Sequence, residues 1–403
     1  MSGYTPSRSG RLLLICCLVC FSCFFAVYMR MPLFPLFATS LGADSVQVGM
    51  LNALFMFLAG ALCVPAGIWS DLVGRRLPIL CGVFILSCAS LLLFRAQSVS
   101  HLMGICVLAG VGMSIFGPPL MSYVADVTPA DQLGSAFAWY TTSLYSAMTL
   151  GPAVGGLLGR SIGYRPVFLG AAILLFVFFW VVLFFLPPSR PRDPAPVQRV
   201  SFALVLELLR NRRLLVCLVT MFGSCIGYGM FLTFMPLYAR QLGLDSAHVG
   251  WIFAAQGLAN TVCRIPLGRL GDRLADRSLI ATAGLAGFTV SLAVLGFASS
   301  FSALVLGAIF FGATLGTAFT ALVALTAEAA PKEMRGLALG LYNSCVYFGM
   351  MLSSAVMGGV VRGFGFGVAF FVCAGLTLLV AFVFFSLHRV GFSGGSSAGP
   401  SAA

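Results

Sequence analysis

Long apolar stretches, separated by short polar connections, run along nearly the whole chain. Each stretch is long enough for a helix of about 20 residues, the length that crosses the hydrocarbon core of a bilayer. Apolar and polar positions do not alternate within the stretches, so a transmembrane β-barrel is not expected. The pattern predicts twelve spanning helices, near residues 12–38, 47–69, 77–95, 101–124, 135–158, 166–187, 214–239, 247–270, 279–298, 301–325, 337–360 and 367–387.

The composition also indicates a membrane protein. Of the 403 residues, 60% are hydrophobic and 8% are charged, against about 25% charged in an ordinary soluble domain. So few charges cannot cover so much apolar surface in water, which excludes a soluble enzyme and a disordered chain. All thirteen cysteines lie in apolar stretches, where thiols behave as small hydrophobes, so no disulfide scaffold is expected. Cys16, Cys20 and Cys23 share a helical face, but no His or carboxylate joins them. Packing is therefore preferred to a soft-metal site, and no cofactor or metal is expected.

The formal net charge of +12 at pH 7 could suggest binding to nucleic acid. With the N-terminus inside, however, sixteen of the 23 Lys and Arg fall on the inner side and five on the outer side. This positive-inside distribution places both termini in the cytoplasm of a multi-pass protein of the cytoplasmic (inner) membrane. The N-terminal apolar run lacks a small-residue cleavage pattern, so it is interpreted as the first span. Nucleic acid is not an expected partner.

An internal repeat divides the chain into two parts. Residues 35–76 align with residues 236–277 without a gap at an offset of 201, and the block 126–134 matches 328–336. Two parallel six-span halves are expected, and such halves enclose a solute site at their interface near the bilayer midplane. The predicted organisation is an N-terminal half at 1–187, a cytoplasmic linker with a short amphipathic helix at 188–213, a C-terminal half at 214–390 and a disordered tail at 391–403.

Three motifs resemble those of the major facilitator superfamily. Residues 67–76 resemble its loop 2–3 signature, G-x-x-x-D-x-x-G-R-K/R, and follow the second predicted span on the cytoplasmic side. Residues 151–156 resemble the G-P-x-x-G-G motif that is typical of its antiporters. Residues 32–35 resemble the P-x-x-P element of its twelve-span drug:proton antiporter branch. Together with the repeat, the resemblance implies an all-α membrane fold of twelve transmembrane helices in two pseudo-symmetric six-helix halves.

The loop 2–3 motif is expected to form a conformational latch. Asp71 and Arg75 are four residues apart and share a face if they are helical. The resemblance implies that Arg75 pairs with Asp126 at the end of the fourth span, while Asp71 meets the start of the eleventh span. Such a latch would hold the inner gate in the outward-open state. The predicted latch residues are Gly67, Asp71, Gly74, Arg75, Arg76 and Asp126.

Positive-inside anchoring is the alternative interpretation of the two arginines in this motif. Anchoring requires neither Asp71 nor Gly74, so the latch is preferred. The second copy of the motif has Ala275 and Asp276 in place of the glycine and the first arginine. A latch in the second half is therefore in doubt.

The fifth predicted span contains a glycine stripe. Gly151, Gly155 and Gly159 are spaced by four, so they form a flat surface that permits close helix contact. Pro152 removes a backbone donor and kinks the helix. The resemblance associates this element with exchange and with sealing the site, whereas small-residue packing is the alternative. The predicted helix-5 antiporter motif comprises Gly151, Pro152, Gly155 and Gly156.

The predicted spans contain no evident proton carrier. The superfamily's helix-4 arginine would fall at Cys106, and all eleven acidic residues and three histidines lie in loops or at helix ends. A proton relay inside a membrane ordinarily uses an acidic residue or a histidine within the spans. Proton coupling is therefore implied only by the resemblance, with Asp126 as the default candidate.

Polar residues within the spans are the candidate solute ligands. Arg30 lies toward the outer side of the first span, where it is expected to bind an anionic group of the solute or backbone carbonyls freed by the prolines that follow. Gln256, Asn260 and Arg264 share one face of the eighth span and are expected to line the central cavity, although Arg264 could also extend toward the inner surface. Interhelical hydrogen bonding is the alternative for the others. The predicted substrate-binding residues are Arg30, Asn52, Tyr145, Tyr228, Gln256, Asn260, Arg264, Asn343 and Tyr347.

The sequence thus predicts a monomeric secondary active transporter that exports a small organic compound, drug-like or a metabolite, by alternating access. Its expected partners are this solute and the lipid bilayer, with protons as the coupling ion that the resemblance implies. One alternative is a transporter or exchanger of an organic anion, phosphonate or siderophore-like solute that uses Arg30 and Arg264. Another is a membrane receptor or scaffold without transport. An enzyme is not expected, because the sequence contains no metal-ligand cluster, phosphate loop or nucleophile elbow.

Overall fold

A computed structural model describes residues 6–188, 206, 208–273, 277–331 and 334–392. These residues form helices and short connections, and no strand occurs among them. The helices up to residue 185 are α1 (Pro6–Arg30), α2 (Leu33–Ser40), α3 (Ser45–Ala61), α4 (Cys63–Val73), α5 (Arg76–Arg95), α6 (Val99–Val127), the 3₁₀ helix η1 (Ala130–Gln132), α7 (Leu133–Ser161) and α8 (Tyr164–Phe185). The remaining helices are α10 (Arg212–Gln241), α11 (Ser246–Arg273), α12 (Arg277–Phe297), α13 (Phe301–Ala329) and α14 (Arg335–Phe392).

The first two predicted spans are each broken into two helices. Prolines explain both breaks, because a proline clashes with the carbonyl four residues earlier. Pro35 lies in the first turn of α2, four residues after Met31 in the break between α1 and α2. Pro65 lies in the first turn of α4, four residues after Ala61, the last residue of α3. The bend between α3 and α4 is 42°.

The last two predicted spans both lie in α14, which consists of two helices that meet at a kink. Its backbone leaves the helical conformation at Gly365, whose φ of 86° a residue with a Cβ adopts only with strain. Eight described helices are long and apolar enough to cross a membrane, or nine if the bent pair α3–α4 is one span. Helices α7 and α11 are not among the eight, although they coincide with the fifth and eighth predicted spans. The multi-pass membrane fold is confirmed, and the count of twelve spans stays a prediction.

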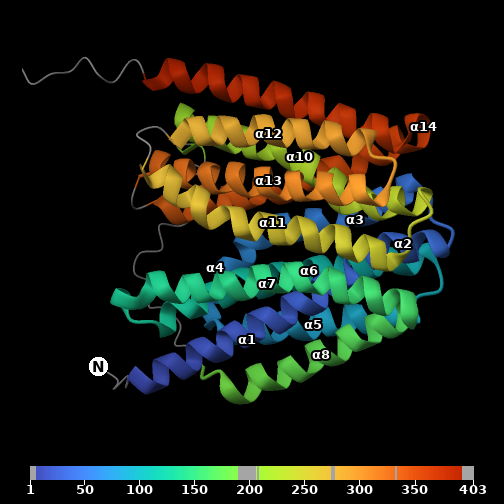
Figure 1. Cartoon of the computed structure of the whole chain (residues 1–403). Helices are drawn as coiled ribbons and strands as arrows, with labels where there is room; N and C mark the ends of the chain where they lie inside the picture. Colours follow the sequence, from blue (N-terminus) through green and yellow to red (C-terminus); the bar gives the residue numbers. More distant parts are fainter. Residues whose placement is uncertain (1–5, 189–205, 207, 274–276, 332–333, 393–403) are drawn as a thin grey trace, which may run out of the picture.

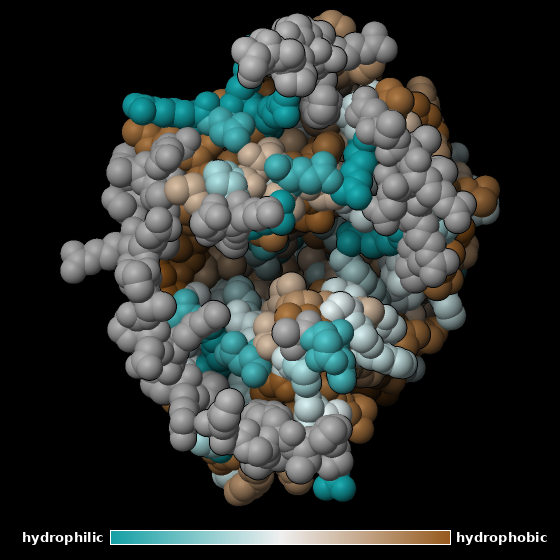
Figure 2. Space-filling view, turned by 90° about the vertical axis from the view of Figure 1, so that its left-hand side faces the viewer, coloured by the Kyte–Doolittle hydropathy of each residue, from teal (hydrophilic) through white to brown (hydrophobic). Residues whose placement is uncertain are grey.

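Figure 1 shows that the helices run side by side, with the start of α1 and the end of α14 at the same end of the molecule. We call this the terminus end and the opposite one the distal end. Helices α1 and α5–α8 lie in one part, α10–α14 lie in the other, and the two parts meet where α3 packs on α14 and α7 packs on α11. The terminus end, seen in Figure 2, is hollowed at its centre.

The distal end is closed because glycines bring the two parts together there. A Cβ on Gly250 of α11 would lie 2.6 Å from the carbonyl oxygen of Pro152, and one on Gly358 of α14 would lie 2.7 Å from that of Ser45. Real Cβ atoms do not approach this closely, so α7–α11 and α3–α14 are in backbone contact. The molecule is therefore closed at the distal end and open at the terminus end.

The predicted domain boundaries remain predictions. Helix α14 continues to Phe392, two residues beyond the predicted end of the C-terminal half at 390. The predicted amphipathic helix at 200–209 lies mostly outside the described residues, as does nearly all of the tail at 391–403.

Candidate functional site

Helices α7 and α11 meet at Arg264. The guanidinium carbon of Arg264 lies 4.4 Å from the centre of the Tyr145 ring, and its Nη1 donates a hydrogen bond to the Tyr145 hydroxyl. Its Nε donates to Oδ1 of Asn260, one turn earlier, at 2.8 Å. Arg264 is thus directed inward toward α7. In this conformation it does not extend toward the inner surface.

Three more tyrosines surround this contact. Tyr28 of α1 interacts electrostatically with Tyr145, Tyr228 and Tyr347. Tyr228 interacts in the same way with Arg264. All four tyrosines are partly exposed, as expected of side chains that line a hollow between helices. We call Tyr28, Tyr145, Tyr228, Asn260, Arg264 and Tyr347 the central cluster. It draws on five helices from both predicted halves: α1, α7, α10, α11 and α14.

Aromatic rings extend the central cluster on the side of α13. The Tyr228 ring lies 6.3 Å from that of Phe311 and 6.2 Å from that of Phe319, measured between centroids. Tyr342, which also lies within electrostatic range of Arg264, donates a hydrogen bond to the Phe319 carbonyl at 3.3 Å. The cluster thus offers one positive charge, several hydroxyls and aromatic faces, a combination that can hold an aromatic or hydrogen-bonding organic compound.

Asn52 takes part in a polar chain between helices. Its Nδ2 donates a hydrogen bond of 2.8 Å to the Thr233 hydroxyl, which shares a second bond of 2.8 Å with the Ser354 hydroxyl. The chain links α3, α10 and α14, as the interhelical alternative for Asn52 predicts. Its role toward a substrate stays a prediction.

The structure does not bring three of the predicted ligands into the central cluster. Arg30 is 5% exposed, donates to the Ser90 hydroxyl at 3.0 Å and lies near Cys106, so it sits among α1, α5 and α6. Gln256 is buried on α11, where its carbonyl faces α13, and Asn343 is exposed near the start of α14. Their substrate-binding roles stay predictions.

Two further tyrosines of this region, Tyr28 and Tyr342, were not predicted from the sequence. The signal for Tyr28 was weak, because one tyrosine in a long apolar span resembles any other packed aromatic residue. Among the described residues, no group of three or more His, Cys, Asp or Glu could hold a metal ion.

The loop 2–3 motif contains the predicted pair of Arg75 and Asp126. Arg75 Nε lies 3.2 Å from Oδ2 of Asp126, and its Nη1 pairs with Asp71 and donates to the Ser70 hydroxyl at 3.2 Å. The turn before it needs Gly74, whose φ is 87°. The pair is intact in a molecule that is closed at the distal end and open at the terminus end, which is the inward-open state if the termini are cytoplasmic as predicted, whereas the latch is expected to hold the outward-open state. The predicted latch function of this pair stays a prediction.

The other two motif residues contact little in this conformation. Arg76 donates a hydrogen bond to the backbone carbonyl of Leu183 at the end of α8. A Cβ on Gly67 would meet no atom within 4 Å, so packing does not explain this glycine.

The second half contains an ion pair that the sequence analysis missed. Arg277 pairs with Glu328, joining the start of α12 to the end of α13. The repeat could have predicted this ion pair, because Arg277 aligns with Arg76 and Glu328 aligns with Asp126. The loss of the first arginine at position 276 therefore does not remove the ion pair from this half.

The glycines of α7 face two different helices. A Cβ on Gly151 would lie 2.9 Å from Cβ of Tyr28, and Gly155 contacts the backbone of Met29, so both face α1. A Cβ on Gly156 would lie 2.8 Å from Cα of Gly250 on α11. The stripe thus provides close packing on both sides of α7, and its proposed role in exchange stays a prediction.

Curated relatives match most of the length of this chain. The chain is 28% identical over 395 residues to the multidrug resistance protein MdtG of Escherichia coli (strain SMS-3-5 / SECEC), which covers 94% of each chain. It is 30% identical over 289 residues to MdtG of Proteus mirabilis (strain HI4320), covering 67% of this chain and 70% of that one.

Solved structures share the fold. A point mutant of the nucleoside transporter NupG matches with a TM-score of 0.79 at 15% identity, covering 93% of this chain and 99% of that one. A bacterial homologue of the human lysosomal transporter Spinster, inward-facing and unoccupied, matches with a TM-score of 0.76 at 17% identity, covering 98% and 100%. The sequence model of the Major Facilitator Superfamily matches residues 16–247 and 217–399. The chain therefore belongs to the major facilitator superfamily and resembles its drug:proton antiporter branch.

Proposed function

We propose that this secondary transporter exports small organic, drug-like compounds across the cytoplasmic (inner) membrane by alternating access. The observation that carries the proposal is the central cluster, which lies between the two predicted halves in a molecule hollowed at the terminus end and closed at the distal end. The positive-inside distribution supports a cytoplasmic terminus end. The described conformation is then inward-facing, ready to take a compound from the cytoplasm.

The chemistry of the central cluster supports this substrate class. Tyrosine faces bind flat apolar or aromatic compounds by stacking, and their hydroxyls and Asn260 provide hydrogen bonds in several directions. Such a surface accepts compounds of different shapes. The similarity to two proteins named as multidrug resistance proteins supports the same substrate class.

An organic anion is the second candidate substrate. Arg264 is the charged member of the central cluster, and its hydrogen bonds to Tyr145 and Asn260 hold it between α7 and α11. An anionic group could take the place of the Tyr145 hydroxyl as the acceptor for Nη1. This candidate uses Arg264 and does not require Arg30, which is buried elsewhere.

Protons are the counter-ion that the resemblance implies. Asp126 is the default carrier from the sequence, and the pair that it forms with Arg75 would have to break for it to take up a proton. We propose a monomer, because one chain provides both halves and every member of the central cluster.

A thermal-shift panel on the purified protein tests the proposal without a working transport assay. The probes are tetraphenylphosphonium, a neutral aromatic antibiotic and salicylate, because a ligand that binds the folded state raises the Tm. Drug export predicts stabilisation by the cation or the neutral compound, and the anion reading predicts stabilisation by salicylate. Arg264→Gln should weaken the shift with salicylate or the neutral compound but not with the cation, which Arg264 repels. Tyr145→Phe should weaken the shift with every probe that binds the central cluster.

The matched control is Arg95→Gln, which removes an exposed arginine at the distal end of α5. It should leave every thermal shift unchanged. The stabilising probe is then offered to inverted membrane vesicles, where the parent protein should accumulate it and Tyr145→Phe should accumulate less of it. The central cluster is not the binding site if its variants and the parent protein show equal shifts.

A further inference from the structure

The repeat forms the same contact twice at the distal end. Ser45 at the start of α3 donates a hydrogen bond of 3.1 Å to the carbonyl of Gly358 on α14. Ser246 at the start of α11 donates one of 3.1 Å to the carbonyl of Gly156 on α7. The two serines are 201 residues apart, the offset of the repeat, and the two glycines are 202 apart, as in its later block.

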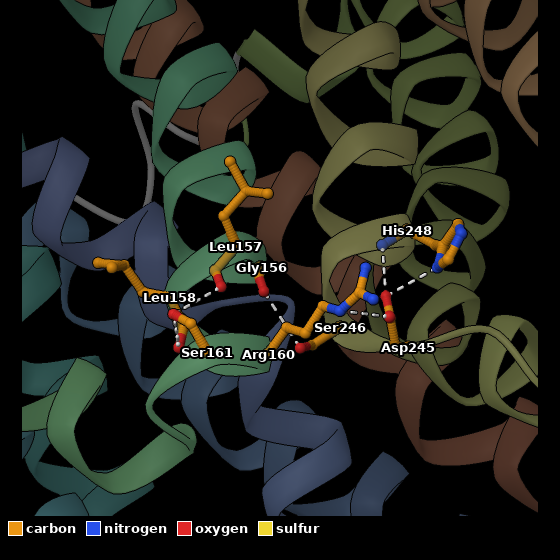
Figure 3. A network of polar contacts seen from close by, with 8 residues as sticks. All are labelled: Gly156, Leu157, Leu158, Arg160, Ser161, Asp245, Ser246 and His248. Carbon is orange, nitrogen blue, oxygen red and sulfur yellow. Dashed lines mark hydrogen bonds and ion pairs between the residues drawn. The ribbon is translucent and has the colours of Figure 1, made fainter.

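An ion pair accompanies each serine contact. Asp44 lies 3.3 Å from Arg362, and Asp245 lies 3.1 Å from Arg160. The aspartates and the arginines also follow the two offsets of the repeat. We call Asp44, Ser45, Gly358 and Arg362 the first clamp. The second clamp, drawn in Figure 3, consists of Asp245, Ser246, Gly156 and Arg160. Each clamp joins one predicted half to the other.

Two residues at equivalent positions of the repeat contact each other at the distal end. Arg240 at the end of α10 donates a hydrogen bond of 3.2 Å to the Thr39 hydroxyl at the end of α2. These two residues are also 201 apart. A residue touches its own equivalent only at a two-fold axis, so the clamps are related by a pseudo-two-fold axis through this contact.

The clamps differ three residues after their aspartates. In the first clamp, Gln47 Oε1 accepts from the Asp44 backbone N–H at 3.1 Å, so an uncharged side chain caps α3. In the second clamp the equivalent residue is His248, whose Nδ1 lies 2.7 Å from Oδ1 of Asp245. Figure 3 shows both His248 and Arg160 directed at the Asp245 carboxylate. Histidine ordinarily changes its charge between pH 5 and 8, and glutamine does not.

The charged groups around His248 are few. From α7, Arg160 binds the other carboxylate oxygen of Asp245. From α13, the uncharged Phe301 packs against the imidazole with ring centroids 4.7 Å apart. From α10, Arg240 is directed to Thr39 and the Leu36 carbonyl. The His248 side chain is 36% exposed, so protons reach it from the distal solution even in the closed molecule.

Asp245 remains ionised in this arrangement. Partial burial opposes its charge, but hydrogen bonds from the backbone and imidazole of His248, together with Arg160, hold the pKa of Asp245 below its ordinary value. A lowered pKa means that the carboxylate's contribution to closure is present above its ordinary pKa and is lost only as the pH falls through the lowered one. Asp245 therefore keeps its negative charge between pH 5 and 8.

We propose that His248 is a proton-binding site that releases the second clamp from the distal side. With His248 neutral, the negative charge of Asp245 attracts Arg160 across the two halves. A proton on His248 neutralises the Asp245–His248 pair and repels Arg160, so the attraction between the halves weakens. The first clamp has Gln47 in place of His248, so only the second clamp responds to protons in this proposal.

Thermodynamic linkage gives the direction in which pH shifts the closed-to-open equilibrium. His248 binds a proton more tightly once Arg160 has moved away, so acid on the distal side favours the molecule that is open there. The proposal rests on the alternating-access movement proposed above. It adds a proton site at the start of α11, whereas the predicted spans contain no evident proton carrier.

Spin labels across the distal end test the proposal. Cysteines replace the exposed Ser161 of α7 and Gln241 of α10, and double electron–electron resonance in lipid nanodiscs measures their separation at pH 8 and pH 5. The parent protein is labelled in parallel to subtract any signal from its native cysteines. We expect the long-distance population to rise about two- to fivefold at pH 5, the effect of one exposed ion pair.

Three variants separate the outcomes. His248→Gln, which copies the first clamp, should remove the rise, whereas Gln47→His, which copies the second clamp, should steepen it. His101→Gln, at another exposed histidine of the distal end, is the control and should behave like the parent.

An equal rise in His248→Gln and the parent would overturn the proton switch, as would a parent population that is the same at both pH values. If no long distance occurs at any pH or in any variant, the alternating-access movement itself fails, and with it the proposed function.

Discussion

Adding one methyl group at Gly250 should open the distal end. A Cβ at this position would lie 2.6 Å from the Pro152 carbonyl oxygen and 3.0 Å from Cα of Gly156. Both atoms belong to the backbone of α7, so no side chain can turn aside to make room. Gly250→Ala is therefore expected to force α7 and α11 apart.

The size of this effect follows from two opposing terms. Overpacking a tight contact costs about 1–3 kcal/mol, and it acts only while α7 and α11 touch. The higher helix propensity of alanine contributes roughly 0.5–1 kcal/mol, but it stabilises the open and closed molecules equally and cancels from their ratio. The closed-to-open equilibrium should thus move toward opening by about 5- to 150-fold.

The spin-label pair on residues 161 and 241 measures this shift at a fixed pH of 8. Gly104→Ala in α6 is the matched control, because a Cβ there meets no atom within 4 Å. It should leave the distance distribution unchanged and raise the Tm slightly. If Gly250→Ala and Gly104→Ala both reproduce the parent distribution, backbone contact between α7 and α11 does not close the distal end.

Three further substitutions test other contacts. Exchanging the charges of Arg75 and Asp126 should restore part of the transport that either single reversal loses, measured as vesicle uptake; no recovery in the double variant argues against a working pair. Gly74→Ala forces a residue with a Cβ to a φ of 87° and a ψ of 154° and should cost about 1–3 kcal/mol, lowering the Tm by a few degrees; an unchanged Tm would show that the turn adapts. Tyr145→Phe keeps the ring beneath Arg264 but removes its acceptor, so affinity for the stabilising probe should fall about three- to tenfold in a titration of the thermal shift. Equal affinity would place the probe elsewhere.

The fold was accessible from the sequence because its signals are periodic and redundant. Apolar stretches of membrane length predicted the helices, and the repeat predicted that the second part copies the first. Helix breaks were harder to predict. Pro35 and Pro65 each lie in the first turn of a helix that follows a break, whereas Pro152 lies inside the continuous helix α7. Neighbouring contacts decide whether a helix continues past a proline.

The site was predictable only in part, because spacing along one helix does not say which neighbour a side chain meets. Asn260 and Arg264 share a face by spacing, and they do contact each other. The partner of Arg264 across the interface, Tyr145, depends on how α7 and α11 are rotated against each other. The burial of Arg30 beside Ser90 depends in the same way on the packing of α1 against α5.

The contact between Arg240 and Thr39 has a consequence for how such a chain can arise by duplication. Freshly duplicated halves are identical, so an arginine on the pseudo-two-fold axis would face a second arginine at hydrogen-bond distance. Two like charges so close repel each other, and the distal end could not close over them. Axial positions must therefore diverge early. This chain keeps a cation in one copy and a hydroxyl acceptor in the other. Elsewhere the copies can stay alike, because each residue meets a different partner.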